Sequence, residues 1–130
     1  TVSTDLNQVV EEYIKKGLLN KNGAGNIKTQ INNVLNHSKI KHLFKSNLKV
    51  FSEYNILSKN GEIFRPDRVV LHSKEIVSLI DYKTGEQRNE DYIQMKKYEK
   101  VLLDIGFKKV EKYLVYLAKS DKKVDVEKYE

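Results

Sequence analysis

Hydrophobic positions in the first third of the chain recur three or four residues apart. This period is that of one helix face, and it predicts a helix over residues 5–16 and a second helix starting near Ile27. The apolar residues of the two stripes are Leu6, Val9, Val10, Tyr13, Ile14, Ile27, Ile31, Val34 and Leu35, and a further turn or two carries Ile40, Leu43 and Phe44. We therefore expect residues 1–46 to form an N-terminal helical part.

The period of the pattern changes near residue 48. Residues 48–57, 64–71 and 75–83 read as strands, and the Asn-Gly pair within 58–61 is a hairpin signal. Pro66 lacks an N–H group, so we expect an edge position or a bulge there. Three strands with such short connections predict an antiparallel meander.

The second half of the chain predicts a strand–helix–strand unit. Residues 90–105 read as a helix that Gly106 ends, and residues 110–118 read as a strand. The expected apolar stripe of this helix is Tyr98, Val101, Leu102 and Ile105. A crossover of this length places the last strand parallel to its neighbour. The charged residues 121–130 either fray or add an edge strand, and the fold class is α/β with a mixed sheet preceded by helices.

The composition describes one polar folded domain. The chain has 130 residues, of which 39% are hydrophobic and 32% charged, so we interpret 1–130 as a single domain with its sheet core in 47–118. No apolar run approaches the roughly 20 residues of a membrane span, and no secretory leader is recognisable. The absence of cysteine excludes disulfides and thiolate metal sites. We therefore expect a cytoplasmic protein with no membrane partner.

The charge raises the question of a polyanionic partner. Lys and Arg number 24 against 18 Asp and Glu, which leaves a net charge of +6. Cationic surfaces gain free energy by displacing counterions from phosphates, so the excess favours nucleic acid as a partner. Most of the basic residues are lysines, and a solvated surface is the alternative explanation.

Two carboxylates and one ammonium are predicted to meet at one end of the sheet. Asp81 and Lys83 end an apolar strand and share one of its faces, because side chains alternate between faces. Asp67 lies on the preceding strand, and pairing of the two strands brings it beside Asp81. Carboxylate oxygens are ligands of Mg²⁺, and a lysine can offset charge that develops at a phosphorus. The alternative is an exposed ion pair at a strand end.

The helix that follows carries a polar pair on its apolar face. Gln94 and Tyr98 are four residues apart, so they lie side by side on the helix. A buried amide without a partner is unfavourable, and Gln94 therefore needs an explanation. Either the pair satisfies backbone groups of the core, or it reaches towards a nucleic-acid strand.

Three segments together resemble a known nuclease family. Residues 65–69 read RPDRV, residues 80–85 read IDYKTG, and residues 94–98 read QMKKY. Their order and the elements that carry them resemble the RecB-like nucleases of the PD-(D/E)xK superfamily, which have Asp, then Asp-Tyr-Lys, then Gln-x-x-x-Tyr on the next helix. The similarity covers residues 48–118, and it is closest to the C-terminal nuclease domains of UvrD-like and AddA-like bacterial helicases.

The resemblance implies a restriction-endonuclease-like core with a Mg²⁺ or Mn²⁺ site. Asp67 and Asp81 would be metal ligands, with the Tyr82 backbone carbonyl as a possible third, and Lys83 would be catalytic beside the two aspartates. Glu53 matches a further acidic position, for which an exposed strand residue is the alternative.

The implied activity is that of a metal-dependent deoxyribonuclease, an exonuclease by expectation. Gln94 and Tyr98 would bind DNA, and a helicase domain of the same polypeptide or complex would be the partner in double-strand-break repair and recombination. The alternative is a catalytically inactive DNA-binding or scaffolding domain with a nuclease fold.

One family feature has no counterpart in these residues. RecB-like nucleases carry a metal-binding histidine on a helix that precedes the region covered here, and His37, His42 and His72 do not have that context. Either the ligand is absent, or the chain, which starts at Thr1 and which we interpret as a fragment of a longer protein, begins after that helix. We therefore expect the isolated chain to bind metal weakly and to cleave DNA slowly.

Overall fold

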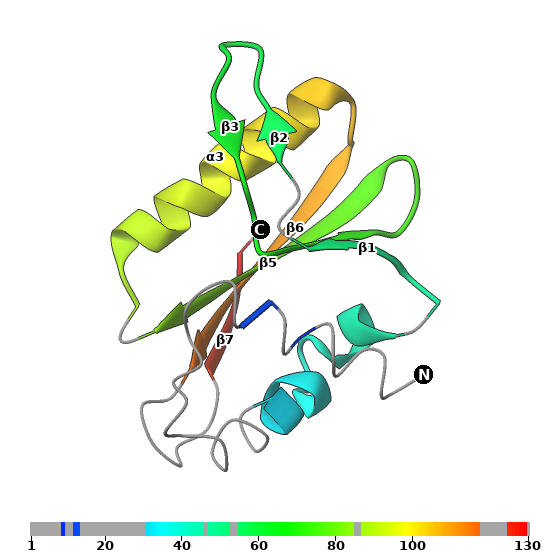
Figure 1. Cartoon of the computed structure of the whole chain (residues 1–130), viewed down its shortest axis with the longest axis vertical. Helices are drawn as coiled ribbons and strands as arrows, with labels where there is room; N and C mark the ends of the chain where they lie inside the picture. Colours follow the sequence, from blue (N-terminus) through cyan, green and yellow to red (C-terminus); the bar gives the residue numbers. More distant parts are fainter. Residues whose placement is uncertain are drawn as a thin grey trace.

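The computed structural model describes residues 9, 12–13, 31–45, 47–52, 55–84, 87–117 and 125–129. Its centre is a five-stranded mixed sheet with the order β1-β4-β5-β6-β7 (Figure 1). The strands are β1 (Lys49–Ser52), β4 (Arg68–Leu71), β5 (Ile76–Thr84), β6 (Lys109–Leu117) and β7 (Asp125–Tyr129). β5 and β6 are parallel, whereas the other neighbouring strands pair antiparallel. The predicted α/β class with a mixed sheet is thus confirmed.

The parallel pair follows from the predicted crossover. β5 and β6 pair over their whole lengths, and α3 (Asn89–Ile105) connects them. Gly106 ends the helix with a φ of 129°, a conformation that favours glycine, and its N–H group bonds to the last turn of α3. β7 pairs with β6 as an edge strand, which is one of the two expectations for the charged C-terminal segment.

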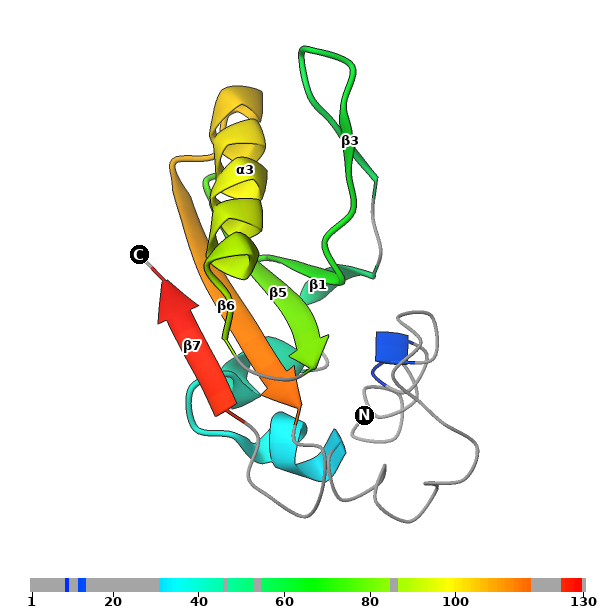
Figure 2. The same cartoon turned by 90° about the vertical axis from the view of Figure 1, so that its left-hand side faces the viewer.

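The sheet has a hydrophobic cluster on each face. α3 covers one face, and the helical residues 31–36 and η2 (Lys41–Phe44), a 3₁₀-helix, lie on the other side (Figures 1 and 2). The cluster under α3 includes Val69, Leu79, Met95, Leu102 and Leu114. The second cluster includes Tyr13, Ile31, Leu43, Val70, Ile80 and Tyr82. Successive residues of β4 and β5 therefore contribute to opposite clusters, as strand geometry requires.

The helical expectation for the first third is confirmed where the structure describes it. Val9, Glu12 and Tyr13 are helical, residues 31–36 form a helix, and a 3₁₀ turn carries Leu43 and Phe44. The rest of the predicted range 5–16, and the start of the second helix near Ile27, lie outside the described residues. Among the described residues, no helix is long and apolar enough to cross a membrane.

The prediction of continuous strands over 48–57 and 64–71 was wrong. β2 (Ile56–Leu57) and β3 (Ile63–Phe64) form a separate two-stranded hairpin between β1 and β4, and this arm projects past the sheet (Figure 2). Arg65 Nε donates to Asn55 Oδ1 at 2.7 Å and closes the base of the arm. Pro66 is neither an edge residue nor a bulge; it is buried in the link between β3 and β4, where no ladder needs its missing N–H group. The antiparallel meander is therefore β1, β4 and β5.

The predicted apolar stripe of α3 needs one correction. Tyr98, Val101 and Leu102 are buried as expected, but Ile105 is 59% exposed. Ile105 is the last residue of the helix, so no following turn covers it. Met95 fills the other end of the stripe and is fully buried.

An ion pair fastens α3 to the sheet. Lys112 is a β6 residue with no exposed side-chain surface, and its ammonium contacts the carboxylate of Glu99 on α3. Glu99 also pairs with Lys96 at 3.1 Å and keeps 18% of its side-chain surface exposed. Burial acts to raise the pKa of Glu99, but the hydrogen bonds from Lys112 and Lys96 outweigh it and lower the pKa overall.

Glu99 and Lys112 are expected to contribute unequally to the free energy of unfolding. Glu99→Leu should lower the free energy of unfolding by about 3 kcal/mol, because it leaves a buried ammonium without a counter-charge. Lys112→Met should have a clearly smaller effect, since Glu99 keeps Lys96 and some solvent. Because the pKa of Glu99 is lowered, its contribution should be present at neutral pH and fade as the pH falls below about 4.5. Urea unfolding at pH 7 and pH 4 measures both effects, and equal losses in the two variants would contradict this account.

Candidate active site

The two predicted aspartates lie side by side where β4 begins and β5 ends. Arg68 pairs with Ile80 at the end of the antiparallel ladder, so Asp67 and Asp81 occupy the next positions along the two strands. Asp67 is 3% exposed and Asp81 is fully buried. Buried carboxylates require partners, because transfer of an isolated charge out of water is strongly unfavourable.

Backbone N–H groups hold both carboxylates. The Asp67 amide donates to Asp81 Oδ1 at 2.9 Å, and the Tyr82 amide donates to Asp67 Oδ2 at 2.8 Å. Each aspartate is therefore fixed by the strand that carries the other one. These reciprocal bonds replace the regular ladder at the point where the two strands separate. The predicted meeting of the two carboxylates is present in the structure.

Lys83 completes the cluster from the same strand face as Asp81. Its Nζ lies 3.2 Å from Asp81 Oδ2 and donates to Gln94 Oε1 at 2.7 Å. The Lys83 side chain is 17% exposed, so the ammonium lies at the rim of the buried carboxylates. This position allows contact with a ligand that approaches from solvent.

Gln94 has a partner that neither sequence interpretation included. It is partly buried near the start of α3, and its amide oxygen orients the Lys83 ammonium. The helix therefore positions the lysine of the cluster. The Gln94 amide nitrogen is a further hydrogen-bond donor of the same side chain.

Tyr98 lies one turn after Gln94 and packs into the core. It is 5% exposed, and its ring meets Phe64 of β3 edge to face, with the centroids 5.7 Å apart. Burial, together with the negative charges of Asp81 and Asp67, raises the pKa of Tyr98 well above its usual range. The phenol hydroxyl is thus protonated and lies within the field of both carboxylates.

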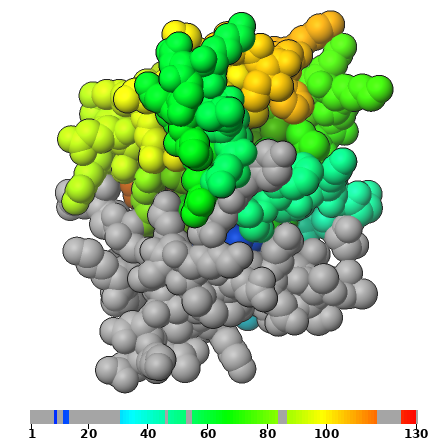
Figure 3. Space-filling view, turned by 45° about the horizontal axis from the view of Figure 1, so that its top comes forward, coloured from blue at the N-terminus to red at the C-terminus, as the bar shows by residue number. Residues whose placement is uncertain are grey.

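A groove of about 430 Å³ lies between the hairpin arm and α3. The atoms of these two elements lie next to one another in Figure 3. The groove is lined by Ile63, Phe64, Arg65, Glu90, Ile93, Gln94, Lys97 and Tyr98. Both polar residues singled out on α3 therefore contribute to its wall. Arg65 and Lys97 were missed by sequence reasoning, because single basic residues in a lysine-rich chain give no distinguishing signal.

The cluster suits a small hard cation that takes few protein ligands. Within the described part of the chain, no third Asp, Glu, His or Cys joins Asp67 and Asp81 in a metal-ligating group. Mg²⁺ needs only one or two carboxylates, since waters and phosphate oxygens complete its shell. The two adjacent carboxylates fit that requirement. Glu53, the further acidic candidate, lies outside the described residues.

The three histidines are positioned elsewhere. The His37 ring accepts from the Lys39 amide, and His42 packs against Tyr113 on the sheet face opposite α3. His72 follows the far end of β4, where its Nε2 lies 2.8 Å from Ser78 Oγ.

A scan against protein-family models matches no family, and a search of curated proteins finds no match.

Proposed function

We propose that this chain is a metal-dependent nuclease domain of the PD-(D/E)xK superfamily that hydrolyses phosphodiester bonds in DNA. The observation that carries the proposal is the convergence of Asp67, Asp81 and Lys83, with each carboxylate fixed by a backbone amide and the lysine fixed by Gln94. An exposed ion pair needs neither buried carboxylates nor hydrogen bonds that fix their orientation. The arrangement of these three charged groups therefore favours a ligand site over an ion pair at a strand end. The restriction-endonuclease-like core and the RecB-like relationship belong to this proposal.

Each residue has a role that follows from its position. Asp67 and Asp81, with the Tyr82 carbonyl, would hold Mg²⁺ or Mn²⁺. When bound, such an ion supplies Lewis-acid polarisation of the phosphoryl oxygen and a water of lowered pKa. Lys83 Nζ donates to the phosphate oxygens and offsets the negative charge that grows on them in the transition state.

Gln94 acts on this reaction through Lys83. Its amide oxygen occupies one ammonium donor while a second faces Asp81, and the third would be available to a ligand. A preorganised donor needs no reorientation at the moment of reaction, which is the source of its effect on rate. We therefore assign Gln94 a positioning role as well as the proposed contact with DNA.

The groove beside the cluster supports a polynucleotide substrate. Arg65 and Lys97 offer cationic contacts for phosphates, and exposed Ile63 and Ile93 offer apolar contacts for bases. Tyr98 lines the inner wall next to Gln94. The net charge of +6 favours the same class of ligand. A helicase domain in the same polypeptide or complex would deliver the strand, and the process served would be break repair and recombination in the bacterial cytoplasm.

The proposal is tested by incubating the full chain with end-labelled single- and double-stranded DNA. With Mg²⁺ or Mn²⁺ present, we expect products that lack the label or shorten progressively, and no products in excess EDTA. Labels at the 5′ and 3′ ends separate exonuclease from endonuclease cleavage. Binding of DNA without cleavage in either metal would overturn the nuclease assignment and favour a non-hydrolytic DNA-binding domain. Cleavage that persists in EDTA would contradict the assigned role of the carboxylates.

A further inference from the structure

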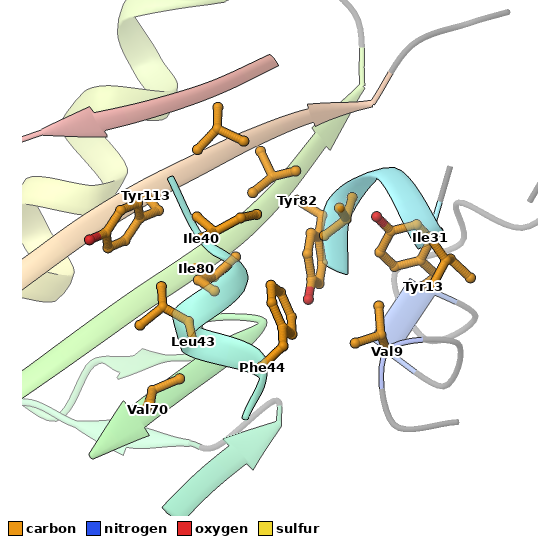
Figure 4. Packing of buried hydrophobic residues seen from close by; sticks show 13 residues of the cluster. Val9, Tyr13, Ile31, Ile40, Leu43, Phe44, Val70, Ile80, Tyr82 and Tyr113 are labelled. Carbon is orange, nitrogen blue, oxygen red and sulfur yellow. The ribbon is translucent and has the colours of Figure 1, made fainter. Parts of the chain in front are cut away.

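The residue after each aspartate points to the opposite face of the sheet. Arg68, the first residue of β4, follows Asp67, and Tyr82 follows Asp81 on β5, so strand alternation places both side chains away from α3. Both are fully buried there. In Figure 4 the Tyr82 ring lies between Phe44 and Tyr13, on the side where the helical residues of the first third pack.

A single carboxylate connects these two side chains. Arg68 Nη1 donates to Glu12 Oε2 at 2.9 Å, and the Tyr82 hydroxyl donates to Glu12 Oε1 at 3.0 Å. Glu12 is a helical residue with 1% exposure. One oxygen thus binds β4 and the other binds β5, directly behind the positions of Asp67 and Asp81.

We propose that Glu12 is a positioning residue that ties β4 to β5 from behind the sheet and thereby fixes the separation of the Asp67 and Asp81 carboxylates. The inference rests on the proposed metal-dependent function, because that separation matters only for a ligand that both aspartates hold. The link to the cluster is short: the Tyr82 hydroxyl binds Glu12, while the Tyr82 amide binds Asp67 Oδ2 at 2.8 Å.

The surroundings of Glu12 keep this bridge in one arrangement. The Arg68 guanidinium lies over the Phe44 ring, 4.5 Å from its centroid, and its Nη2 donates to the Leu43 carbonyl at 3.3 Å. Tyr82 meets Tyr13 edge to face, with the centroids 4.8 Å apart. A planar guanidinium held at a ring face and at two acceptors has little freedom to move.

A purely stabilising role explains Glu12 less well. Burial raises the pKa of Glu12 to about 7, although the Arg68 charge and the hydrogen bonds from Tyr82 and Arg68 act to lower it. Buried ion pairs are often no more stabilising than well-packed apolar side chains of similar volume. An apolar residue at position 12 would fill the space but would not connect the two strands. The geometric connection is what the carboxylate adds.

The test measures Mn²⁺ affinity of the full chain by electron paramagnetic resonance of the free ion, at a temperature well below unfolding. Glu12→Gln and Tyr82→Phe should each weaken Mn²⁺ binding about tenfold, the order of loss seen when support of a metal ligand is removed. Combined, they should weaken binding little further, since both break the same bridge. Tyr82→Phe keeps the fold testable if Glu12→Gln fails to fold.

Tyr113→Phe is the matched control. Tyr113 is a buried tyrosine of the same cluster, and its hydroxyl also bonds to a glutamate, Glu111, at 3.2 Å. Tyr113 belongs to β6, and the hydrogen bonds that join Glu12 to Arg68 and Tyr82 do not involve it. Its variant should therefore bind Mn²⁺ within twofold of the parent chain. Thermal melts of all variants separate affinity from stability.

The possible failures are distinguishable. Parent-like Mn²⁺ affinity in Glu12→Gln or in Tyr82→Phe would overturn the positioning role and leave the nuclease proposal intact. An equal loss of Mn²⁺ affinity in Tyr113→Phe would also overturn the positioning role, because that result would show a general effect of removing a hydroxyl group from the core. A parent chain that neither binds Mn²⁺ nor cleaves DNA would overturn both proposals.

Discussion

Lys83→Met is expected to lower the rate of DNA cleavage at saturating Mg²⁺ by about a hundred- to a thousandfold, the usual loss when one preorganised donor to a transition-state charge is removed. The Lys83 ammonium lies 3.2 Å from Asp81 Oδ2 and 2.7 Å from Gln94 Oε1, so methionine removes a side chain that bridges Asp81 and α3. The loss should appear in the single-turnover rate rather than in DNA affinity, because the charge that Lys83 offsets grows during the reaction.

Lys108→Met supplies the control for loss of a paired lysine. Lys108 pairs with Glu75 at 3.1 Å, and both side chains are largely exposed at the other end of β5. Exposed pairs contribute little to stability, so this variant should cleave and melt as the parent chain does. A Lys83→Met chain that cleaves DNA at the parent rate and melts at the parent temperature would refute the catalytic role.

Asp67→Asn is expected to abolish the stabilisation that Mg²⁺ gives to the folded chain. At a Mg²⁺ concentration one hundred times the dissociation constant, binding to the folded state alone adds about 2.7 kcal/mol, and the variant should show none of it. Asparagine has nearly the same shape and keeps an oxygen that can accept from the Tyr82 amide. Without metal, the variant should be at least as stable as the parent, because it removes one of two adjacent buried negative charges.

Thermal melts with and without Mg²⁺ check this prediction without reference to cleavage. Asp104→Asn changes the same side chain at an exposed position of α3, so it should keep the full response to Mg²⁺. A response to Mg²⁺ that is unchanged in Asp67→Asn would show that the ion binds elsewhere on the chain.

The hydrophobic pattern of the sequence predicts most accurately the helix and the strand in which that pattern continues without interruption. Residues 90–105 and 110–118 closely match α3 and β6, and Gly106 ends the helix where expected. The same alternation placed Asp81 and Lys83 on one strand face and Asp67 beside them. These features depend on contacts within a strand pair or one helix turn, which sequence spacing describes directly.

The hairpin arm shows where local pattern stops being informative. The strands predicted over 48–57 and 64–71 run across the points at which the chain leaves the sheet, and Pro66 is the signal that the sequence offers for an irregularity there. The departure depends on Pro66 and on the Arg65–Asn55 hydrogen bond, which joins residues ten positions apart. The groove beside Gln94 exists only because this arm leaves the sheet and faces α3.

The sequence by itself determined the helix and strand types, the hydrophobic faces and the three charged residues that meet at the strand ends. The tertiary structure alone decided the partners of the buried polar groups. Gln94 binds Lys83 across two elements, and Glu12 binds Arg68 and Tyr82 from positions 56 and 70 residues away along the chain. A glutamate in an amphipathic helix has the spacing of a solvent-exposed residue. Its burial follows from which helix packs on which sheet face, and that choice is a property of the whole core rather than of any local segment.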